Sequence, residues 1–221
     1  MFISSEPAIL YFGTPVVLIS TVNEDLSCNL APMSSAFWLG WRCILGLAAS
    51  SKTTQNIIRT GECVLNLPSV HQVAAVNRLA RTTGSNPVPE AKQKKGYHYE
   101  QEKFRVAGLT PIPSVTVTPP RVQECPVHLE ARVAAIHGVA EEEPAQRGRI
   151  VNIELRIQRV HLHTDIIMDG HPNQVDPDKW RPLIMSFQQF YGLGEQVHAS
   201  ALAQIPEELY YSKDVERART V

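Results

Sequence analysis

The sequence predicts a mainly β domain that closes, or nearly closes, into a barrel with flanking helices. Before residue 50, short apolar runs rich in β-branched residues alternate with clusters of turn formers. Two longer segments further along alternate apolar and polar side chains with a period of two. Helix start and stop signals are few. Because closure leaves no exposed strand edge, many short antiparallel strands favour a barrel.

The N-terminal part predicts three to four consecutive antiparallel strands. The run TPVVLISTVN (14–23) leads into the turn formers NEDLSCN (23–29). Two further runs, NLAPMSSAFWLG (29–40) and RCILGLAAS (42–50), continue the pattern without helix punctuation. Proline has no N–H to donate to a strand ladder, so we expect Pro32 at a sheet edge or a bulge. Backbone groups beside Pro32 are then free to bind another partner.

Two helices are expected beside these strands. Thr53 or Thr54 is predicted to N-cap a helix over TQNIIRTG (54–61), and Gly61 is predicted to end it. A second helix is predicted over VHQVAAVNRLA (70–80), which carries an apolar stripe at helical spacing.

The rest of the chain is predicted to be mostly strands and loops. ECVLNL (62–67) is a short strand, whereas residues 115–136 and 149–167 alternate over long stretches and predict two long strands. The acidic segment AEEEPAQRGR (140–149) predicts a solvated hairpin connection. The polar segment 82–102 contains Pro and Gly, so we expect an exposed loop there, and the part of the chain most prone to disorder.

Composition excludes several classes of function. The 221 residues include 21 basic and 22 acidic side chains, with a pI near 6.7, which leaves no electrostatic footprint for nucleic acid or an anionic membrane. No apolar stretch reaches the ~20 residues that cross a bilayer, and MFISSEPAIL (1–10) lacks the features of a signal peptide. We therefore expect a cytoplasmic protein. The four cysteines form no CxxC pair and are expected to be buried thiols.

Four hydroxyl side chains and one lysine fill the five positions from Ser50 to Thr54. The first N–H groups of a helix have no intrahelical partner and attract anions. The hydroxyls of Ser50, Ser51, Thr53 and Thr54, with the ammonium of Lys52, could therefore surround the oxygens of a phosphate monoester. The simpler alternative is that the hydroxyls cap the helix and that the lysine is solvated. This stretch alone does not decide between the two.

A second feature is the small-residue stretch NLAPMSSAF (29–37). Pro32 interrupts strand pairing, and Ala31, Ser34 and Ser35 keep the local side chains small. Backbone groups there could approach the polar edge of a flat ring system such as an isoalloxazine. The alternative is an edge strand whose small side chains pack against a partner sheet.

These two features coincide with a resemblance to a known family. Residues 15–37 (PVVLISTVNEDLSCNLAPMSSAF), 50–67 (SSKTTQNIIRTGECVLNL) and 103–133 (KFRVAGLTPIPSVTVTPPRVQECPVHLEARV) resemble the flavin reductase-like family, the FMN-binding split barrels, in the same order along the chain. The resemblance implies a six-stranded split β-barrel of Greek-key type, a homodimer, and one FMN per subunit near the dimer interface. We accordingly expect a barrel domain over 1–170 and a C-terminal extension over 171–221 that packs on the barrel or on the dimer partner.

The resemblance also assigns roles to individual positions. It places the stretch from Asn29 to Ser35 along the isoalloxazine ring and ribityl chain, and the stretch from Ser50 to Thr54 around the 5′-phosphate. In this assignment Lys52 neutralises the phosphate and Asn56 supports the loop. The cofactor-binding residues implied are Asn29, Ala31, Pro32, Met33, Ser34, Ser35, Ser50, Ser51, Lys52, Thr53, Thr54 and Asn56.

The sequence departs from the family pattern in three places. Leu26 stands where members commonly carry Gly, and WLGWRC (38–43) stands where many have an Asp-Pro-Pro run. Trp38 is consequently a candidate for a ring contact. VHLHTD (160–165) replaces a Gly-Asp-His segment. The aromatic segment FQQFYGLG (187–194) is expected to pack in the dimer.

The function implied is hydride transfer from NADH or NADPH to FMN and on to an acceptor, with no catalytic side chain required. A non-catalytic flavin-binding module, or a subunit that donates reduced flavin to a monooxygenase, is the alternative. A pyridoxamine-phosphate-oxidase-like barrel would need a second basic cluster, and none is visible in the sequence. His161, His163 and Asp165 could ligate a metal, but structural strand histidines are the preferred interpretation, so we predict no metal site.

Overall fold

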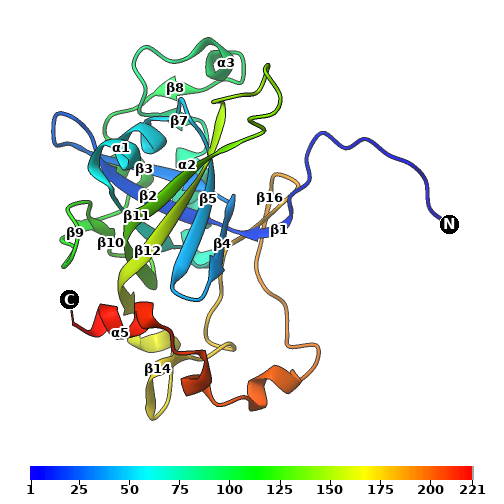
Figure 1. Ribbon diagram of the computed structural model, residues 1–221, viewed down its shortest axis with the longest axis vertical. Helices are drawn as coiled ribbons and strands as arrows, with labels where there is room; N and C mark the ends of the chain where they lie inside the picture. Colours follow the sequence, from blue (N-terminus) through cyan, green and yellow to red (C-terminus); the bar gives the residue numbers. More distant parts are fainter. Residues whose placement is uncertain (221) are drawn as a thin grey trace.

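A seven-stranded antiparallel sheet with strand order β3-β2-β6-β11-β12-β5-β4 is the body of the molecule. The computed structural model describes residues 1–220 (Figure 1). The mainly β architecture with flanking helices is confirmed. The strands of this sheet are β2 (Val17–Val22), β3 (Cys28–Met33), β4 (Ala36–Leu39), β5 (Arg42–Ala48), β6 (Glu62–Leu67), β11 (Val127–Val139) and β12 (Ile150–Leu162).

Shorter elements surround this sheet. The helices are α1 (Lys52–Thr60), α2 (Val73–Leu79), α3 (Glu90–Gln93), α4 (Lys103–Ala107) and α5 (Lys213–Arg219), with 3₁₀ turns η1 (Val70–Gln72), η2 (Thr164–Ile166), η3 (Ala201–Gln204) and η4 (Glu207–Tyr210). The short strands are β1 (Phe12–Pro15), β7 (Thr82–Thr83), β8 (His98–Tyr99), β9 (Pro111–Ile112), β10 (Arg121–Val122), β13 (Ile167–Met168), β14 (His171–Val175), β15 (Ile184–Ser186) and β16 (Gln189–Tyr191).

The two edges of the sheet, β3 and β4, are consecutive in the chain. Only Ser34 and Ser35 separate them, so the chain passes directly from one edge of the sheet to the other. The Gly46 N–H donates to the Ser35 carbonyl (2.9 Å) and the Ser35 hydroxyl donates to the Gly46 carbonyl (2.5 Å), which fastens the crossing to β5. The sheet therefore has seven strands where six were expected. Pro32 lies in the edge strand β3, as predicted.

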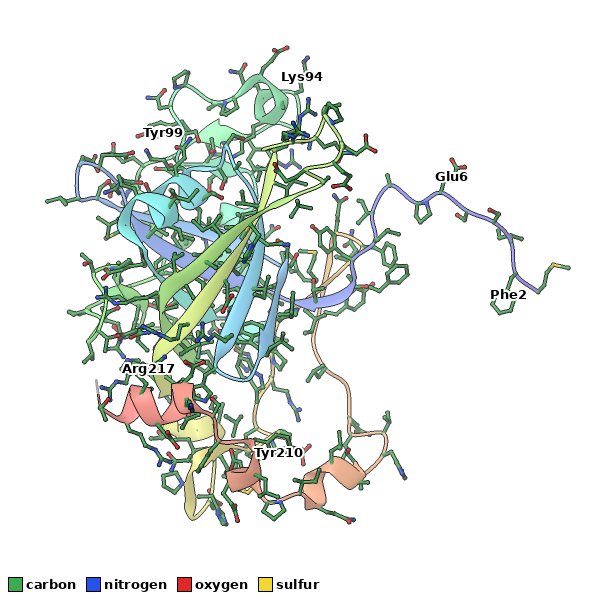
Figure 2. All side chains as sticks on the ribbon, in the orientation of Figure 1. Phe2, Glu6, Lys94, Tyr99, Tyr210 and Arg217 are labelled. Atoms are coloured by element: carbon green, nitrogen blue, oxygen red, sulfur yellow. The ribbon has the colours of Figure 1, made fainter. Side chains whose placement is uncertain are left out.

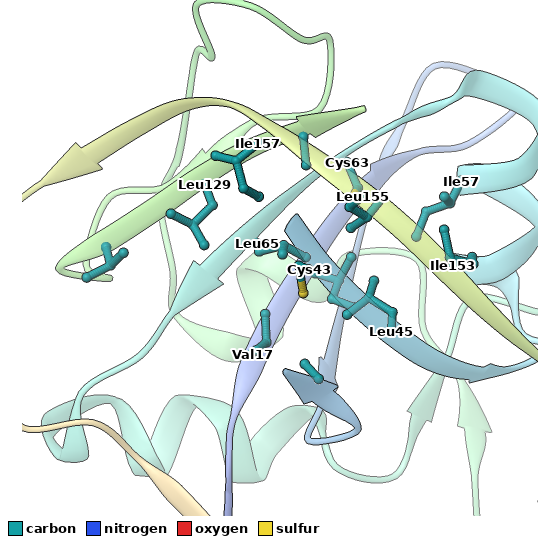
Figure 3. Close-up of a cluster of buried hydrophobic side chains, with 14 of the residues drawn as sticks. Val17, Cys43, Leu45, Ile57, Cys63, Leu65, Leu129, Ile153, Leu155 and Ile157 are labelled. Carbon is teal, nitrogen blue, oxygen red and sulfur yellow. The ribbon is translucent and has the colours of Figure 1, made fainter. Parts of the chain in front are cut away.

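Strand β2 contributes to two separate cores because its side chains alternate between two faces. Val17 and Ile19 point into the barrel, where they pack with residues such as Leu45 and Leu155 (Figure 3). Leu18, from the opposite face, packs in a second cluster with side chains of α2 and α4. Burial on both faces fixes the register of β2.

Helix α1 follows the prediction except at its first turn. Ser51, rather than Thr53 or Thr54, is the N-cap, and its hydroxyl accepts from the Thr54 N–H (3.2 Å). Gly61 ends the helix with φ 71°, a left-handed conformation that glycine adopts without strain. The second predicted helix is present as η1 followed by α2.

One predicted long strand is shorter than expected. Residues 115–120 have no strand structure, and the strand begins only at Val127. Two buried carboxylates capture the backbone instead. Glu130 accepts from the N–H groups of Val115 (2.9 Å) and Thr116 (2.5 Å), and Glu62 accepts from the Thr118 N–H (2.8 Å). Hydrogen bonds to side chains replace a strand ladder in this segment.

The segment 82–102 is more ordered than the sequence predicts. Thr82 and Thr83 are buried, and β7 pairs in parallel with β8. With α3 these strands form a small cover at the top of the molecule in Figure 1. The second long strand (β12) and the hairpin connection before it are confirmed.

Both ends of the chain lie outside the main sheet. The N-terminal arm extends away from the body, with Phe2 and Glu6 in solvent (Figures 1 and 2). At the other end, β15 pairs with β1 and with β16, while α5 packs on β12. Asp214 of α5 binds Arg42 of β5 (2.7 Å). Among residues 1–220, no helix has the length and apolarity to span a bilayer.

We predict that Glu130→Gln destabilises the fold by about 2 kcal/mol, because a buried carboxylate that accepts several hydrogen bonds then presents an amide N–H to donors. Glu130 is fully buried and also accepts from Thr116 Oγ1 (2.6 Å) and His161 Nε2 (2.8 Å). Urea denaturation at pH 7 measures the change. Glu142→Gln, on the exposed hairpin, is the matched control.

The same comparison has an expected pH dependence. Burial by itself raises the pKa of Glu130, but hydrogen bonds from Thr116, Val115 and His161 outweigh it, so the pKa lies below its ordinary value of 4.5. A lowered pKa stabilises the fold above the unfolded-state value, and this contribution is lost as pH falls through the folded-state value. The difference between wild type and Glu130→Gln should therefore shrink below pH ~4.5. A difference independent of pH would contradict the assignment.

Candidate functional site

A pocket of about 280 Å³ lies where the chain crosses between the two sheet edges. Three segments and the side chain of Tyr11 form it. The first runs through β3 to Ser35, the second through the end of β5 into the first turn of α1, and the third is the cover of residues 79–103. The two segments singled out in the sequence therefore meet in one place, and the cover, which was expected to be a mobile loop, supplies a third wall.

The twelve predicted residues divide into two groups. Residues that line the pocket are Ala31, Pro32, Met33, Ser35, Ser51, Lys52 and Thr53. Residues that do not line it are Asn29, Ser34, Ser50, Thr54 and Asn56.

Two of the four clustered hydroxyls have a structural role. Besides its capping bond, Ser51 Oγ lies 2.8 Å from Thr54 Oγ1, and Thr54 Oγ1 donates to the Ala48 carbonyl (2.9 Å). Capping therefore accounts for Ser51 and Thr54, as the simpler alternative held. Thr53 is different, because its Oγ1 accepts from Asn29 Nδ2 (3.1 Å) and so is oriented toward β3. Ser50 is exposed.

Asn29 stands behind the pocket with an unused acceptor. Its Nδ2 donates to Thr21 Oγ1 (3.2 Å) and to Thr53 Oγ1, while its buried Oδ1 has no partner among the described residues. Gly84 of the cover lies against this oxygen, and a Cβ built there would stand 2.8 Å from Asn29 Oδ1 and 3.1 Å from Lys52 Cγ. An unsatisfied buried acceptor beside a glycine indicates a position built for close approach.

Asn56 supports the site from further away. It is fully buried, and its Nδ2 donates to Thr21 Oγ1 (3.0 Å) and to Asn23 Oδ1 (2.8 Å). It ties α1 to β2 and to the following turn. Its role is therefore to hold the first turn of α1 in place relative to β3.

Lys52 is already paired with a carboxylate. Its Nζ lies 2.6 Å from Glu24 Oε2, and this hydrogen bond is the main cause of the lowered pKa of Glu24. Arg59 approaches the same carboxylate at 4.0 Å. The positive charge that the sequence assigned to this corner is therefore largely offset before any ligand binds.

The cover supplies polar residues that sequence reasoning missed. Thr83, Lys92, Tyr97 and Lys103 line the pocket. Lys92 Nζ donates to Thr83 Oγ1 (3.1 Å) and lies 5.8 Å from the centre of the Tyr97 ring. The lysine-rich run AKQKKGYHYEQEKF (91–104) was the available signal. Because the segment was expected to be disordered, its lysines were not considered as pocket residues.

The cover also brings two buried or half-buried lysines to the pocket. Lys103 is only 3% exposed, and burial lowers its pKa to about 8. Burial also lowers the pKa of Lys92. Two lysines distant from Lys52 in sequence thus bring further positive charge to the same pocket.

Aromatic and histidine side chains take positions that differ from those predicted. Trp38 packs against the barrel core and does not line the pocket, whereas Tyr11 and Tyr97 do line it. His161 binds the buried Glu130, as a structural strand histidine would. His163 lies beyond the end of β12 and accepts from the Asp165 N–H (3.3 Å).

No cluster of three or more His, Cys, Asp or Glu side chains in residues 1–220 has metal-binding geometry. All four cysteines are free, and three of them are buried.

Comparison with known proteins gives a consistent result. The model of the flavin reductase like domain family matches residues 9–193. YdfE of Bacillus subtilis (strain 168) is 38% identical over 192 residues, which cover 87% of this chain and 89% of that protein. Flavoredoxin of Desulfovibrio vulgaris (Miyazaki F) superposes with a TM-score of 0.73 at 22% identity, covering 92% of this chain and 99% of that one. Component B of nitrilotriacetate monooxygenase from Bacillus cereus superposes with a TM-score of 0.68 at 20% identity, covering 85% and 88%.

The contrast between Ser50 and Ser51 is testable. We expect Ser51→Ala to lower the free energy of unfolding by about 1 kcal/mol, because it removes the N-cap of α1. Ser50→Ala, one position earlier on an exposed side chain, should change it by less than about 0.5 kcal/mol. Urea denaturation of both variants decides the matter. Equal effects would mean that capping does not distinguish the two serines.

Proposed function

The chain belongs to the flavin reductase-like domain family, and we propose that it binds FMN in the pocket at the barrel crossing and passes hydride from NADH or NADPH to that flavin. One observation carries the proposal. Residues 31–33, 35 and 51–53, which were singled out independently in the sequence, line the same pocket. Separation of these segments to opposite ends of the molecule would have removed its basis.

The residues of the pocket suit a flavin mononucleotide. The N-terminal N–H groups of α1 favour an anion such as the 5′-phosphate, and the lysines of the cover add positive charge. Asn29 lies behind the pocket, where its Nδ2 donates to the hydroxyl of Thr53 and so orients this pocket-lining residue. Gly84 lets the cover pack closely against Asn29 and Lys52. These groups bind and orient, and none of them has to transfer a proton.

When bound, FMN supplies the redox chemistry, with N5 as the site that accepts hydride. The contribution of the chain is to hold the ring against the edge strand β3 and to limit the access of water. Small side chains at Ala31 and Ser35, and the absence of an N–H at Pro32, leave this edge open on the pocket side.

We predict that the purified protein binds FMN and oxidises NADH or NADPH when FMN is present. Gly84→Ala should weaken FMN binding at least several-fold, because the added Cβ would stand 2.8 Å from Asn29 Oδ1 and 3.1 Å from Lys52 Cγ and would displace this wall of the pocket. Gly194→Ala is the matched control, since its added Cβ meets no atom within 4 Å. Flavin fluorescence titration and the loss of nicotinamide absorbance are the two measurements.

The two measurements also separate the alternatives. Protein that binds FMN without consuming either nicotinamide nucleotide would be a flavin-binding module. Protein that turns over and releases reduced FMN to a separate monooxygenase would be a reduced-flavin donor. Protein that does not bind FMN would disprove the proposal.

We further propose that the protein forms a homodimer through the face that carries β1 and β4. Phe12, Phe37 and Leu39 are 73%, 52% and 68% exposed there, and β4 is an edge strand with unpaired backbone groups. Phe187 packs edge-on against Phe12, with 4.8 Å between ring centroids, and extends the apolar face.

Light scattering should therefore give twice the chain mass of 24.6 kDa. Phe37→Glu should shift the protein toward monomer by placing a charge in the interface, whereas Leu209→Glu, an exposed position on η4, should not. A monomeric wild-type protein with FMN bound would contradict the dimer.

A further inference from the structure

We propose that Lys103, together with Lys92, provides the positive charge that selects a phosphate ester in the pocket, in place of Lys52, to which the sequence assigned that role. The inference rests on the proposed function, because it concerns ligands of the same pocket. Beyond the proposed function, the inference names the side chains that recognise the anionic group and identifies that group as a phosphate ester.

Lys103 is a buried ammonium group that makes no ion pair within residues 1–220. It is 3% exposed, lies at the first position of α4 and lines the pocket. Within residues 1–220 its Nζ has no hydrogen bond and no carboxylate within 4.0 Å. Glu100 is the nearby acid, but its Oε1 accepts from the Glu102 N–H (2.7 Å). Buried charges in proteins are normally paired, so this one calls for an anion from outside the chain.

Lys92 adds a second cation from α3. It is half-buried, and its one hydrogen bond goes to the neutral hydroxyl of Thr83. Lys92 and Lys103 lie close enough for their charges to repel, which contributes to the lowered pKa of Lys103. Glu100 offsets part of this charge from a distance, but within residues 1–220 neither lysine has a carboxylate within 4.0 Å. Two cations beside a hydroxyl and the open backbone of Gly84 match the charge and the acceptor oxygens of a phosphate dianion.

Lys52 differs in this respect. Its ion pair with Glu24 is made at the exposed rim, and the Glu24 side chain is 58% exposed. A phosphate that engaged Lys52 would have to compete with that carboxylate. Lys103 and Lys92 form no ion pair that a phosphate would have to break, so phosphate binding to them is more favourable.

Two ligands could supply the phosphate ester. One is the 5′-phosphate of FMN, and the other is a phosphate of the nicotinamide dinucleotide. Riboflavin has the same ring system as FMN without the phosphate, so the ratio of riboflavin Kd to FMN Kd measures recognition of the 5′-phosphate alone. The KM for NADH and NADPH at saturating FMN measures recognition of the dinucleotide.

The experiment compares wild type with Lys103→Met, Lys92→Met, Lys52→Met and the control Lys94→Met. Lys94 lies on the outer surface of the same cover, 73% exposed and paired with Glu90 (Figure 2). We expect Lys103→Met to lower the ratio of riboflavin Kd to FMN Kd at least tenfold and Lys92→Met to lower it several-fold. Lys52→Met and Lys94→Met should each change it less than threefold. Thermal unfolding of each variant establishes that it is folded.

A pH series distinguishes recognition by Lys103 from a structural role. The charged groups around Lys103 are Lys92 and Glu100, and Lys52 with Glu24 stands across the pocket. A lysine with a pKa of about 8 is protonated below that pH, so FMN affinity should fall between pH 7.5 and 9 while riboflavin affinity stays level. Lys103→Met should abolish this dependence. Lys103→Arg should keep the FMN preference and lose the pH dependence, because arginine stays charged.

The outcomes are distinct. Failure of wild type to bind either flavin would disprove the proposed function itself. If Lys103→Met leaves flavin binding unchanged and instead raises the KM for a dinucleotide at least tenfold, the phosphate ester is that of the nicotinamide. If neither quantity changes, or if Lys52→Met costs as much as Lys103→Met, the inference is wrong.

Discussion

The passage of the chain from one edge of the sheet to the other at Ser34 and Ser35 is the constraint on which the rest of the structure depends. A barrel that closed fully would pair β3 with β4 and leave no backbone exposed between them. Here two residues connect the edges, and reciprocal hydrogen bonds between Ser35 and Gly46 hold the connection against β5. The pocket exists because this connection leaves the edge strand β3, with Pro32, unpaired on one side.

Around this opening, several buried polar groups are satisfied only in part. Asn56 joins α1 to Thr21 and Asn23 through its Nδ2, and its Oδ1 has no partner among residues 1–220. Asn29 is satisfied on its donor side only, and Lys103 has no partner among the described residues. Unpaired buried polar groups lower stability, and the buried side-chain atoms of this kind in residues 1–220 are spread over the molecule, from Thr14 to Arg159.

The hydroxyl cluster shows how one stretch of sequence can serve two purposes. Ser51 and Thr54 form the N-terminal cap of α1, and Thr53 orients Asn29 of the neighbouring strand. The cap residue Ser51 and the first two residues of the helix, Lys52 and Thr53, line the pocket. A structural role for one residue of such a stretch does not exclude ligand binding by its neighbour. The role has to be decided for each residue separately.

The sequence by itself determined the mainly β class, the edge position of Pro32 and the end of α1 at Gly61, because these follow from local periodicity, missing N–H groups and capping chemistry. The family resemblance implied that residues 29–35 and 50–54 serve one site, and only the tertiary structure brings residues 31–33 and 51–53 to the same pocket. The sequence did not determine the charge balance of the pocket. Glu24 pairs with Lys52 from 28 positions away, and Lys103 is buried at the start of α4, a helix that packs against α2 and β3. Likewise Glu130 removes residues 115–116 from a strand that their alternation predicts. Pairing and burial between distant segments arise only when the chain has folded, so only the tertiary structure decided which charges are free.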